Sequence, residues 1–234
     1  FERYWYYYHL WGRVGYNPET EPDIAQRQFA QRFGEAGPHL QEGLHLASQV
    51  LPRIVSASYN YRLFPTTRGW AEMMRVYDLP QYAAGEGSDI QQFMNVRDAA
   101  LSRIEGADTP MRRPSETSQW FMDVSNRIGE HIATAERCAG DEPSPEFVST
   151  ACDLRILAAL SRYHSHRLQA GVSYNLFKET GDLFSLDDAI RLEENAVSAW
   201  RQIVDAAGDV YVRDLAFGVQ RTGFSKHWQE ELEK

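Results

Sequence analysis

The chain has 234 residues, of which 43% are hydrophobic and 12% aromatic, enough apolar material to bury the core of one large domain or two small ones. Its 24 basic and 33 acidic residues give a net charge of −9, and no segment concentrates Lys or Arg. We therefore expect neither nucleic acid nor an anionic membrane as a partner. The residues show no signal-peptide pattern, and the sequence does not indicate in which cellular compartment the protein works.

The first eleven residues, Phe1 to Trp11, are mostly aromatic. Chain ends are usually polar and solvated, whereas this segment is apolar on every side and should be buried all round. We expect residues 1–18 to be the tail of a preceding domain or an interface segment, and residues 19–234 to form a helical domain. Because Tyr and Trp also line sugar-binding clefts, a glycan contact and a domain interface both remain open for this segment.

The first half of the domain reads as helices and one long loop. Thr20 caps a helix that ends at Gly34, and a longer helix begins at Pro38 and is kinked by Pro52. Residues 60–87 form a long irregular loop with a short helix near 69–77. Ordered loops of this length are often functional, so Trp70 is a candidate for substrate binding or an interface.

The second half shows clearer helical periodicity. A helix capped by Ser88 runs to about Ile104, and two long helices follow at 115–139 and 145–180. Ser185 with Asp188 caps the next helix, which ends at residue 208. A last helix, 226–234, begins after residue 225 and lacks a stop signal, so we expect it to be truncated. Only residues 209–213 are a candidate strand, so the predicted fold class is all-α and bundle-like.

Several residue groups could carry chemistry, and for each we expect a structural role. Glu42 and His45 have the Glu-x-x-His spacing of di-metal bundles, but a second copy is missing, so we expect no metal and no other cofactor. The adjacent carboxylates at 187–188 and 193–194 should cap a helix or lie in water. His164 lies on an apolar stripe and should be a core histidine. Cys138 and Cys152 should be buried free thiols.

The stretch Trp11-Gly12-Arg13-Val14-Gly15-Tyr16-Asn17-Pro18-Glu19, with a following helix that ends in Arg32-Phe33-Gly34, resembles large microbial glycoside hydrolases. It is most similar to the α-glucuronidase type, glycoside hydrolase family 67, and its uncharacterised relatives. In that family a Trp-Gly-Arg-Leu-x-Tyr-Asx-Pro stretch leads from the catalytic (β/α)₈ barrel into a helical C-terminal domain. Here Val14 replaces the usual Leu, and the motif resemblance covers about residues 5–34.

This resemblance implies that the chain is the helical companion of a missing (β/α)₈ barrel, with the catalytic carboxylates upstream and no catalytic residue in this chain. Trp11, Arg13, Tyr16 and Asn17 would lie at the barrel interface, beside a glycan or in a homo-oligomer contact. Two other functions remain open. One is a self-standing helical module that binds protein, and the other is a small helical enzyme that uses His164.

Overall fold

The computed structural model describes residues 2–58, 78–214 and 227–233, except for residue 22. Within these ranges the chain forms helices joined by turns, and its only β-type pairing is an isolated bridge between Phe93 and Arg112. The predicted all-α fold class is therefore confirmed. Residues 209–213 form turns and bends and no strand. Trp70, the helix expected near 69–77 and residue 225 lie outside the described ranges.

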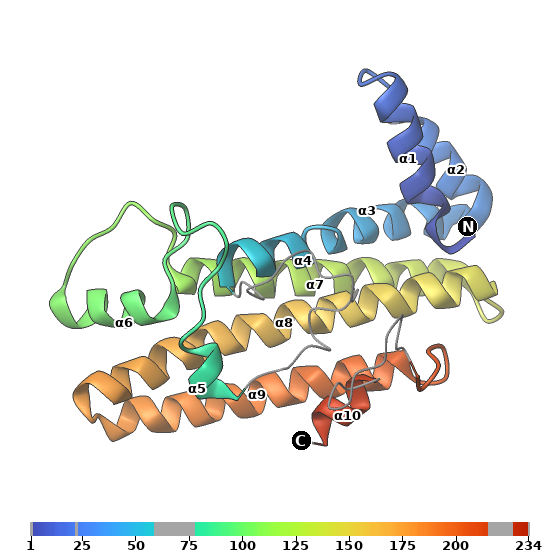
Figure 1. Ribbon diagram of the computed structural model, residues 1–234. Helices are drawn as coiled ribbons and strands as arrows, with labels where there is room; N and C mark the ends of the chain where they lie inside the picture. The colour runs from blue at the N-terminus through green and yellow to red at the C-terminus, as the bar shows by residue number, and fades with distance from the viewer. Residues whose placement is uncertain (1, 22, 59–77, 215–226, 234) are drawn as a thin grey trace.

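Three long helices form a layer at the centre of the fold (Figure 1). They are α7 (Pro114–Ala139), α8 (Pro145–Thr180) and α9 (Leu183–Ala207), and short turns make each antiparallel to the next. Gly181 makes the tight turn between α8 and α9 with φ of 71°. One side of α7 is buried, with Phe121, Ile128 and Ala135 fully inaccessible. This layer is the framework on which the other elements pack.

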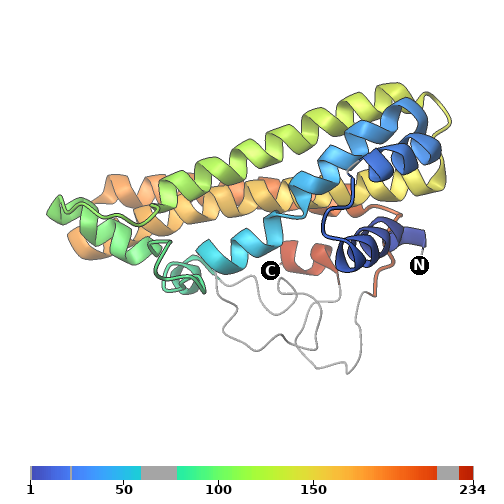
Figure 2. The ribbon, with the colours of Figure 1, turned by 90° about the horizontal axis from the view of Figure 1, so that it is seen from above.

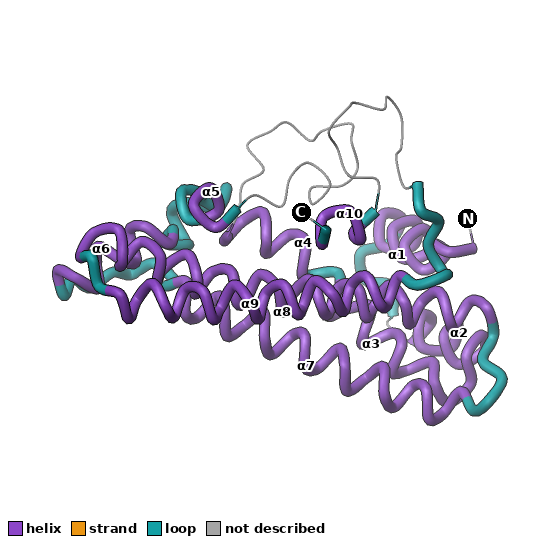
Figure 3. The backbone as a smooth tube through the Cα atoms, turned by 90° about the horizontal axis from the view of Figure 1, so that it is seen from below, coloured by secondary structure: helices purple, strands orange, loops and turns teal. Residues whose placement is uncertain are grey.

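One face of the layer carries the shorter helices. The helix α3 (Gly37–Ala47) packs on α7 and α8, and α10 (Trp228–Leu232) packs on α9. Farther toward the α6 end of the layer lie α4 (Val50–Arg53), a π-helical turn (Ile54–Ser58) and α5 (Leu79–Tyr82) (Figure 1). The views from above and below show α4, α5 and α10 on the same side of the long helices (Figures 2 and 3). At one end of the layer, α6 (Val96–Glu105) contacts α8.

The N-terminal part forms a helical hairpin at the other end of the layer (Figure 1). A 3₁₀ turn (Glu2–Tyr4) leads into α1 (Trp5–Tyr16), which is followed by α2 (Asp23–Phe33) and a second 3₁₀ turn (Gly34–Ala36). The helix α2 packs on α3, so it connects α1 to the rest of the fold. The motif-bearing segment is thus a helix that stands at the edge of the domain.

Three helix boundaries differ from the prediction. The helix expected to run on from Pro38 breaks at residues 48–49, because the Pro52 ring has no N–H to donate to the carbonyl four residues earlier and crowds it. The helix α6 begins after Asn95, whose side chain accepts a hydrogen bond from the Asp98 N–H, and Ser88 lies in the preceding loop. Asp182, and not Ser185 with Asp188, caps α9.

Candidate functional site

The aromatic helix α1 has two unlike faces, which corrects the expectation that it is buried all round. Trp5 is only 4% exposed, and it lies on the face that packs against the domain. Tyr4, Tyr7, Tyr8 and Trp11 are spaced by three or four residues and are exposed by 59%, 60%, 47% and 67%. We call these four residues the aromatic face. One side of α1 thus anchors the helix, and the aromatic face is turned largely toward solvent.

The anchoring side packs against α2. The ring of Phe29, which is completely buried, lies 5.0 Å from the ring of Trp5 and 4.9 Å from that of Tyr6. His9 Nδ1 and Gln28 Nε2 are 3.0 Å apart and share a hydrogen bond. The Arg32 guanidinium lies 4.4 Å from the Trp5 ring centre, in a cation–π contact. These contacts fix the rotation of α1 about its own axis, and this rotation turns the aromatic face outward.

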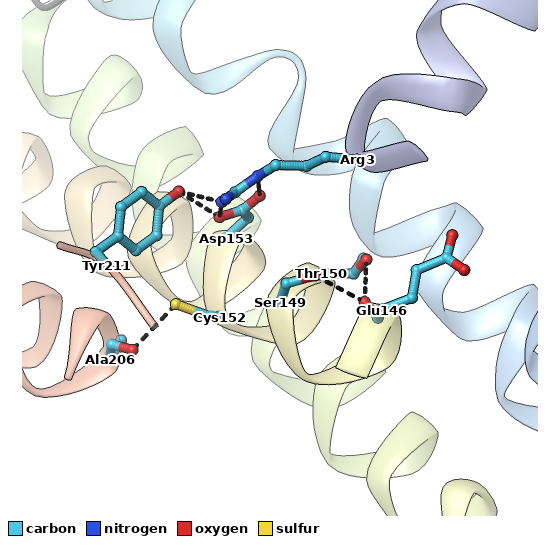
Figure 4. Close-up of polar contacts among 8 residues, drawn as sticks. All are labelled: Arg3, Glu146, Ser149, Thr150, Cys152, Asp153, Ala206 and Tyr211. Carbon is cyan, nitrogen blue, oxygen red and sulfur yellow. Dashed lines mark hydrogen bonds and ion pairs between the residues drawn. The ribbon is translucent and has the colours of Figure 1, made fainter. Parts of the chain in front are cut away.

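A polar cluster holds the start of α1 to the central layer (Figure 4). The Arg3 guanidinium donates to Asp153 Oδ1 of α8 at 2.5 Å and to the Tyr211 hydroxyl at 2.5 Å, and Tyr211 donates to the same carboxylate oxygen at 2.5 Å. Burial opposes the charge on Arg3, but the hydrogen bond and attraction to Asp153 outweigh it, so the Arg3 pKa is raised. Burial, with help from Asp153, also raises the pKa of Tyr211. We call Arg3, Asp153 and Tyr211 the clamp.

A second ion pair supports the hairpin at the same end of the layer. Arg32 Nη1 donates to both carboxylate oxygens of Glu146, at 2.9 and 3.1 Å, in a charge-assisted contact. Glu146 lies in the first turn of α8, and its backbone carbonyl accepts from the hydroxyls of Ser149 and Thr150 (Figure 4). Because Arg32 also covers Trp5, this pair couples the anchoring side of α1 to α8.

On the aromatic face two rings are stacked. The rings of Tyr7 and Trp11 lie 6.1 Å apart with 27° between their planes, and Tyr8 meets Tyr7 edge-on at 5.4 Å. Stacked exposed rings offer a flat apolar surface with polar groups at its edges. Such a surface suits either a second protein surface or the flat side of a sugar ring.

The other motif residues lie around the end of α1. Tyr16 is 94% exposed, and Arg13 is exposed as well. The Asn17 N–H donates to the Arg13 carbonyl at 2.8 Å, and Asn17 Oδ1 accepts from the Glu19 N–H at 3.1 Å, so Asn17 shapes the turn into α2. Since successive helical residues are turned by 100°, Arg13 and Tyr16 point away from the side on which Trp11 lies. Trp70 is outside the described residues.

The structure places His164 elsewhere, in a buried polar cluster between α5, α8 and α9. His164 is 3% exposed, and its Nδ1 lies 3.2 Å from the Tyr82 hydroxyl. Burial, and secondarily the charge of Arg167, lowers the His164 pKa to about 3. The Arg167 side chain is 2% exposed, donates to the Tyr163 hydroxyl at 2.6 Å and lies 3.2 Å from Glu193 Oε1. The prediction that 193–194 lie in water is therefore wrong for Glu193.

The structure also places the cysteines and the candidate metal ligands. Both cysteines are free, as expected, but Cys138 is exposed and only Cys152 is buried. Glu42 lies 3.7 Å from the Arg127 guanidinium, and His45 is exposed. In the described ranges no group of three or more His, Cys, Asp or Glu side chains is arranged to hold a metal ion. None of the described helices is long and apolar enough to cross a bilayer.

Comparison with known proteins gives a structural likeness and no sequence family. No protein-family model matches the chain, and no curated protein matches it. Among solved structures it is similar to a GH138 enzyme targeting pectin rhamnogalacturonan II, with a TM-score of 0.79 and 13% identity. The match covers 99% of this chain and 36% of the other, so the chain spans about a third of that enzyme's length. At this identity the likeness shows the fold alone, and that fold is one found within a glycoside hydrolase.

Proposed function

We propose that this chain is a helical accessory domain of a carbohydrate-active enzyme, a glycoside hydrolase, and that it contains no catalytic centre. The fold shared with part of a GH138 enzyme supports this function, as does the motif around Trp11. The neighbour is more than twice as long as this chain, which leaves most of its length for other parts of the enzyme. In this proposal a catalytic domain of the same parent chain is the main partner.

The aromatic face is the observation that carries the proposal. Four half-exposed Tyr and Trp rings present on the order of 400 Å² of largely apolar surface, a patch size that in soluble proteins often marks an interaction site. The clamp and the packing on Phe29 hold this patch in a fixed orientation on α1. A fixed patch can dock with little further loss of conformational entropy. We infer that the aromatic face packs against the catalytic domain and extends to the wall of its cleft.

The more specific assignment to the α-glucuronidase type rests on the motif alone. It would place Trp11, Arg13, Tyr16 and Asn17 next to the end of a (β/α)₈ barrel. Trp11 would then belong to the docked surface, and Asn17 would set the angle at which the chain enters α2. A glycan or a second copy of the chain at the same surface would be a different occupant.

The test uses the parent enzyme with Trp11→Ala and, as a matched control, Phe184→Ala. Phe184 is 85% exposed in the first turn of α9, and α9 begins at the end of the layer opposite α1 (Figure 1). We expect Trp11→Ala to lower kcat/KM on the parent's carbohydrate at least tenfold, while the thermal midpoint of the isolated chain moves by less than about 2 °C, as for other exposed positions. Full activity in the Trp11 variant, or a large loss of stability in the isolated chain, would contradict the proposal.

A self-standing module that binds protein is the second candidate, because the same aromatic face could receive an unrelated partner. The full reading frame that encodes this chain distinguishes the two functions. A barrel encoded immediately upstream supports the accessory domain, and a start codon next to Phe1 supports the module. A small enzyme using His164 is disfavoured by the geometry, since that imidazole is only 3% exposed and lies against Tyr82 in the interior.

A further inference from the structure

A groove of about 520 Å³ lies across the layer, and all its lining residues come from α7, α8 and α9. Its apolar lining consists mainly of small residues of α8 and α9, Ala158, Ala159 and Ala206. Because small side chains leave space between helices, the groove is wide enough for a small molecule. It is separate from the aromatic face, whose residues all lie at the N-terminal end of the chain, on α1 and the turn before it.

Arg162 spans one end of this groove. Its guanidinium donates to Gln202 Oε1 of α9 at 3.0 Å and lies 3.4 Å from Asn126 Oδ1 of α7. Both acceptors are neutral amides, and no described carboxylate lies within ion-pair distance of Arg162, although the protein carries a net charge of −9. The planar guanidinium has five N–H donors, so the two amides leave several of them available. The two amides hold the guanidinium in place, and they leave its positive charge without a paired carboxylate among the described residues.

Other basic side chains lie near Arg162. His166 follows one turn later on α8, and burial together with the charges of Arg162 and Arg191 lowers its pKa. Two further charged residues line the groove: Arg155, whose charge is paired with Glu136, and Asp205, which follows Gln202 by three residues on α9. Of the two arginines that line the groove, Arg162 is therefore the one whose charge is available to a negatively charged ligand.

A buried hydroxyl also lines the groove. Ser125 is 1% exposed and lines the α7 wall, and its hydroxyl has no hydrogen-bond partner among the described residues. The carbonyl that a helical serine usually contacts, four residues earlier, already accepts from the Ser161 hydroxyl at 2.7 Å. The groove thus combines a preoriented guanidinium with a buried hydroxyl donor that is not used elsewhere.

We propose that the Arg162 end of the groove binds a small organic carboxylate. A carboxylate matches the guanidinium in shape and accepts two parallel N–H bonds, whereas a tetrahedral or spherical anion matches it less well. The proposal does not depend on the accessory-domain function, because it concerns a different surface of the molecule.

The test follows the His166 ring resonances by NMR while sodium acetate replaces sodium chloride at constant ionic strength, with His166→Gln used for assignment. We expect a saturable shift at millimolar acetate and a rise in the His166 pKa, because a bound negative charge next to Arg162 favours protonation. Sodium sulfate should compete poorly. A linear shift, a shift of the same size with chloride, or equal binding of sulfate would overturn the proposal.

Two variants show whether Arg162 makes the site. Arg162→Gln should abolish the saturable shift. Arg162→Lys should weaken acetate binding at least several-fold, because lysine keeps the positive charge but lacks the planar guanidinium. Arg201→Gln removes the same charge from an exposed position of α9 outside the groove lining and should leave acetate binding unchanged. Acetate binding that survives in both Arg162 variants, or that is lost equally in the Arg201 variant, would show that the response is nonspecific.

Discussion

Asp153→Asn should loosen α1 while leaving the α7–α9 layer folded. Asp153 is the shared acceptor of the clamp, since both Arg3 and Tyr211 donate to it. Removing its negative charge weakens both hydrogen bonds at once, whereas the aromatic packing of Trp5 on α2 stays. Proteins open locally at segments of low stability, and α1 contacts the rest of the fold on one side only, so the loss should appear there first.

The size of the effect follows from the exposure of the clamp. Hydrogen bonds to charged groups contribute about 1.5–3 kcal/mol when buried. The Arg3 and Asp153 side chains are 36% and 28% exposed, so water screens part of their attraction. A net loss of about 1–2 kcal/mol remains after this discount. Since about 1.4 kcal/mol corresponds to a factor of ten, the amides of α1 should exchange roughly 5–30 times faster.

Hydrogen–deuterium exchange with mass spectrometry measures this directly, by comparing peptides from α1 with peptides from α9. Asp187→Asn, an exposed change on α9, is the matched control and should alter neither. Faster exchange of α9 to the same degree as α1 would show that the clamp supports the whole fold. Unchanged exchange in α1 would show that the clamp contributes nothing to holding the helix.

Three further predictions concern the interior. Glu193→Gln should cost about 2 kcal/mol in urea unfolding, because it removes a carboxylate charge beside a buried guanidinium, and Glu194→Gln, which is exposed, should cost little. Burial holds the His164 pKa near 3, below its value of about 6.5 in the unfolded chain. The unfolded chain therefore binds the proton more tightly, so the folded state keeps its full stability above about pH 6.5 and loses stability as the pH falls below that value. Between pH 7 and pH 5 the wild type should lose roughly 2 kcal/mol more than His164→Gln, and equal losses would refute this role. Gly87→Ala should destabilise by about 1–3 kcal/mol, since its Cβ would overlap the backbone of the π-helical turn, whereas Gly129→Ala, which meets no atom within 4 Å, should be neutral or stabilising in thermal melts.

The sequence predicted the long helices well, because the capping residues and the hydrophobic periodicity indicate the same helix ends. The helix α8 begins at Pro145 after Ser144, whose hydroxyl accepts from the Phe147 N–H, and it runs to Thr180, as the periodicity indicates. Where several residues could cap a helix, the outcome depends on tertiary contacts. Asp188 accepts a hydrogen bond from Ser173 of α8, and this contact is invisible to a reading of α9 alone.

The candidate site could be predicted only in part. Composition identified the aromatic segment, but it gave no sign that Trp5 and Trp11 lie on opposite sides of a helix with very different exposure. The clamp joins residues 150 positions apart, and no local pattern links Arg3 to Asp153. Arg167 did carry a usable signal, because an arginine in the apolar middle of α8 requires a partner, which proved to include Glu193 of the neighbouring helix.

Hydroxyl-radical footprinting of the aromatic face, in the isolated chain and in the parent enzyme, tests the central proposal most directly. The extent of oxidation reports the solvent exposure of each ring, and Phe184 at the far end of the layer serves as the reference. We predict that Tyr7 and Trp11 react strongly in the isolated chain and are protected severalfold in the parent, while Phe184 reacts equally in both. Equal oxidation of Trp11 in the two proteins would mean that no catalytic domain covers the aromatic face.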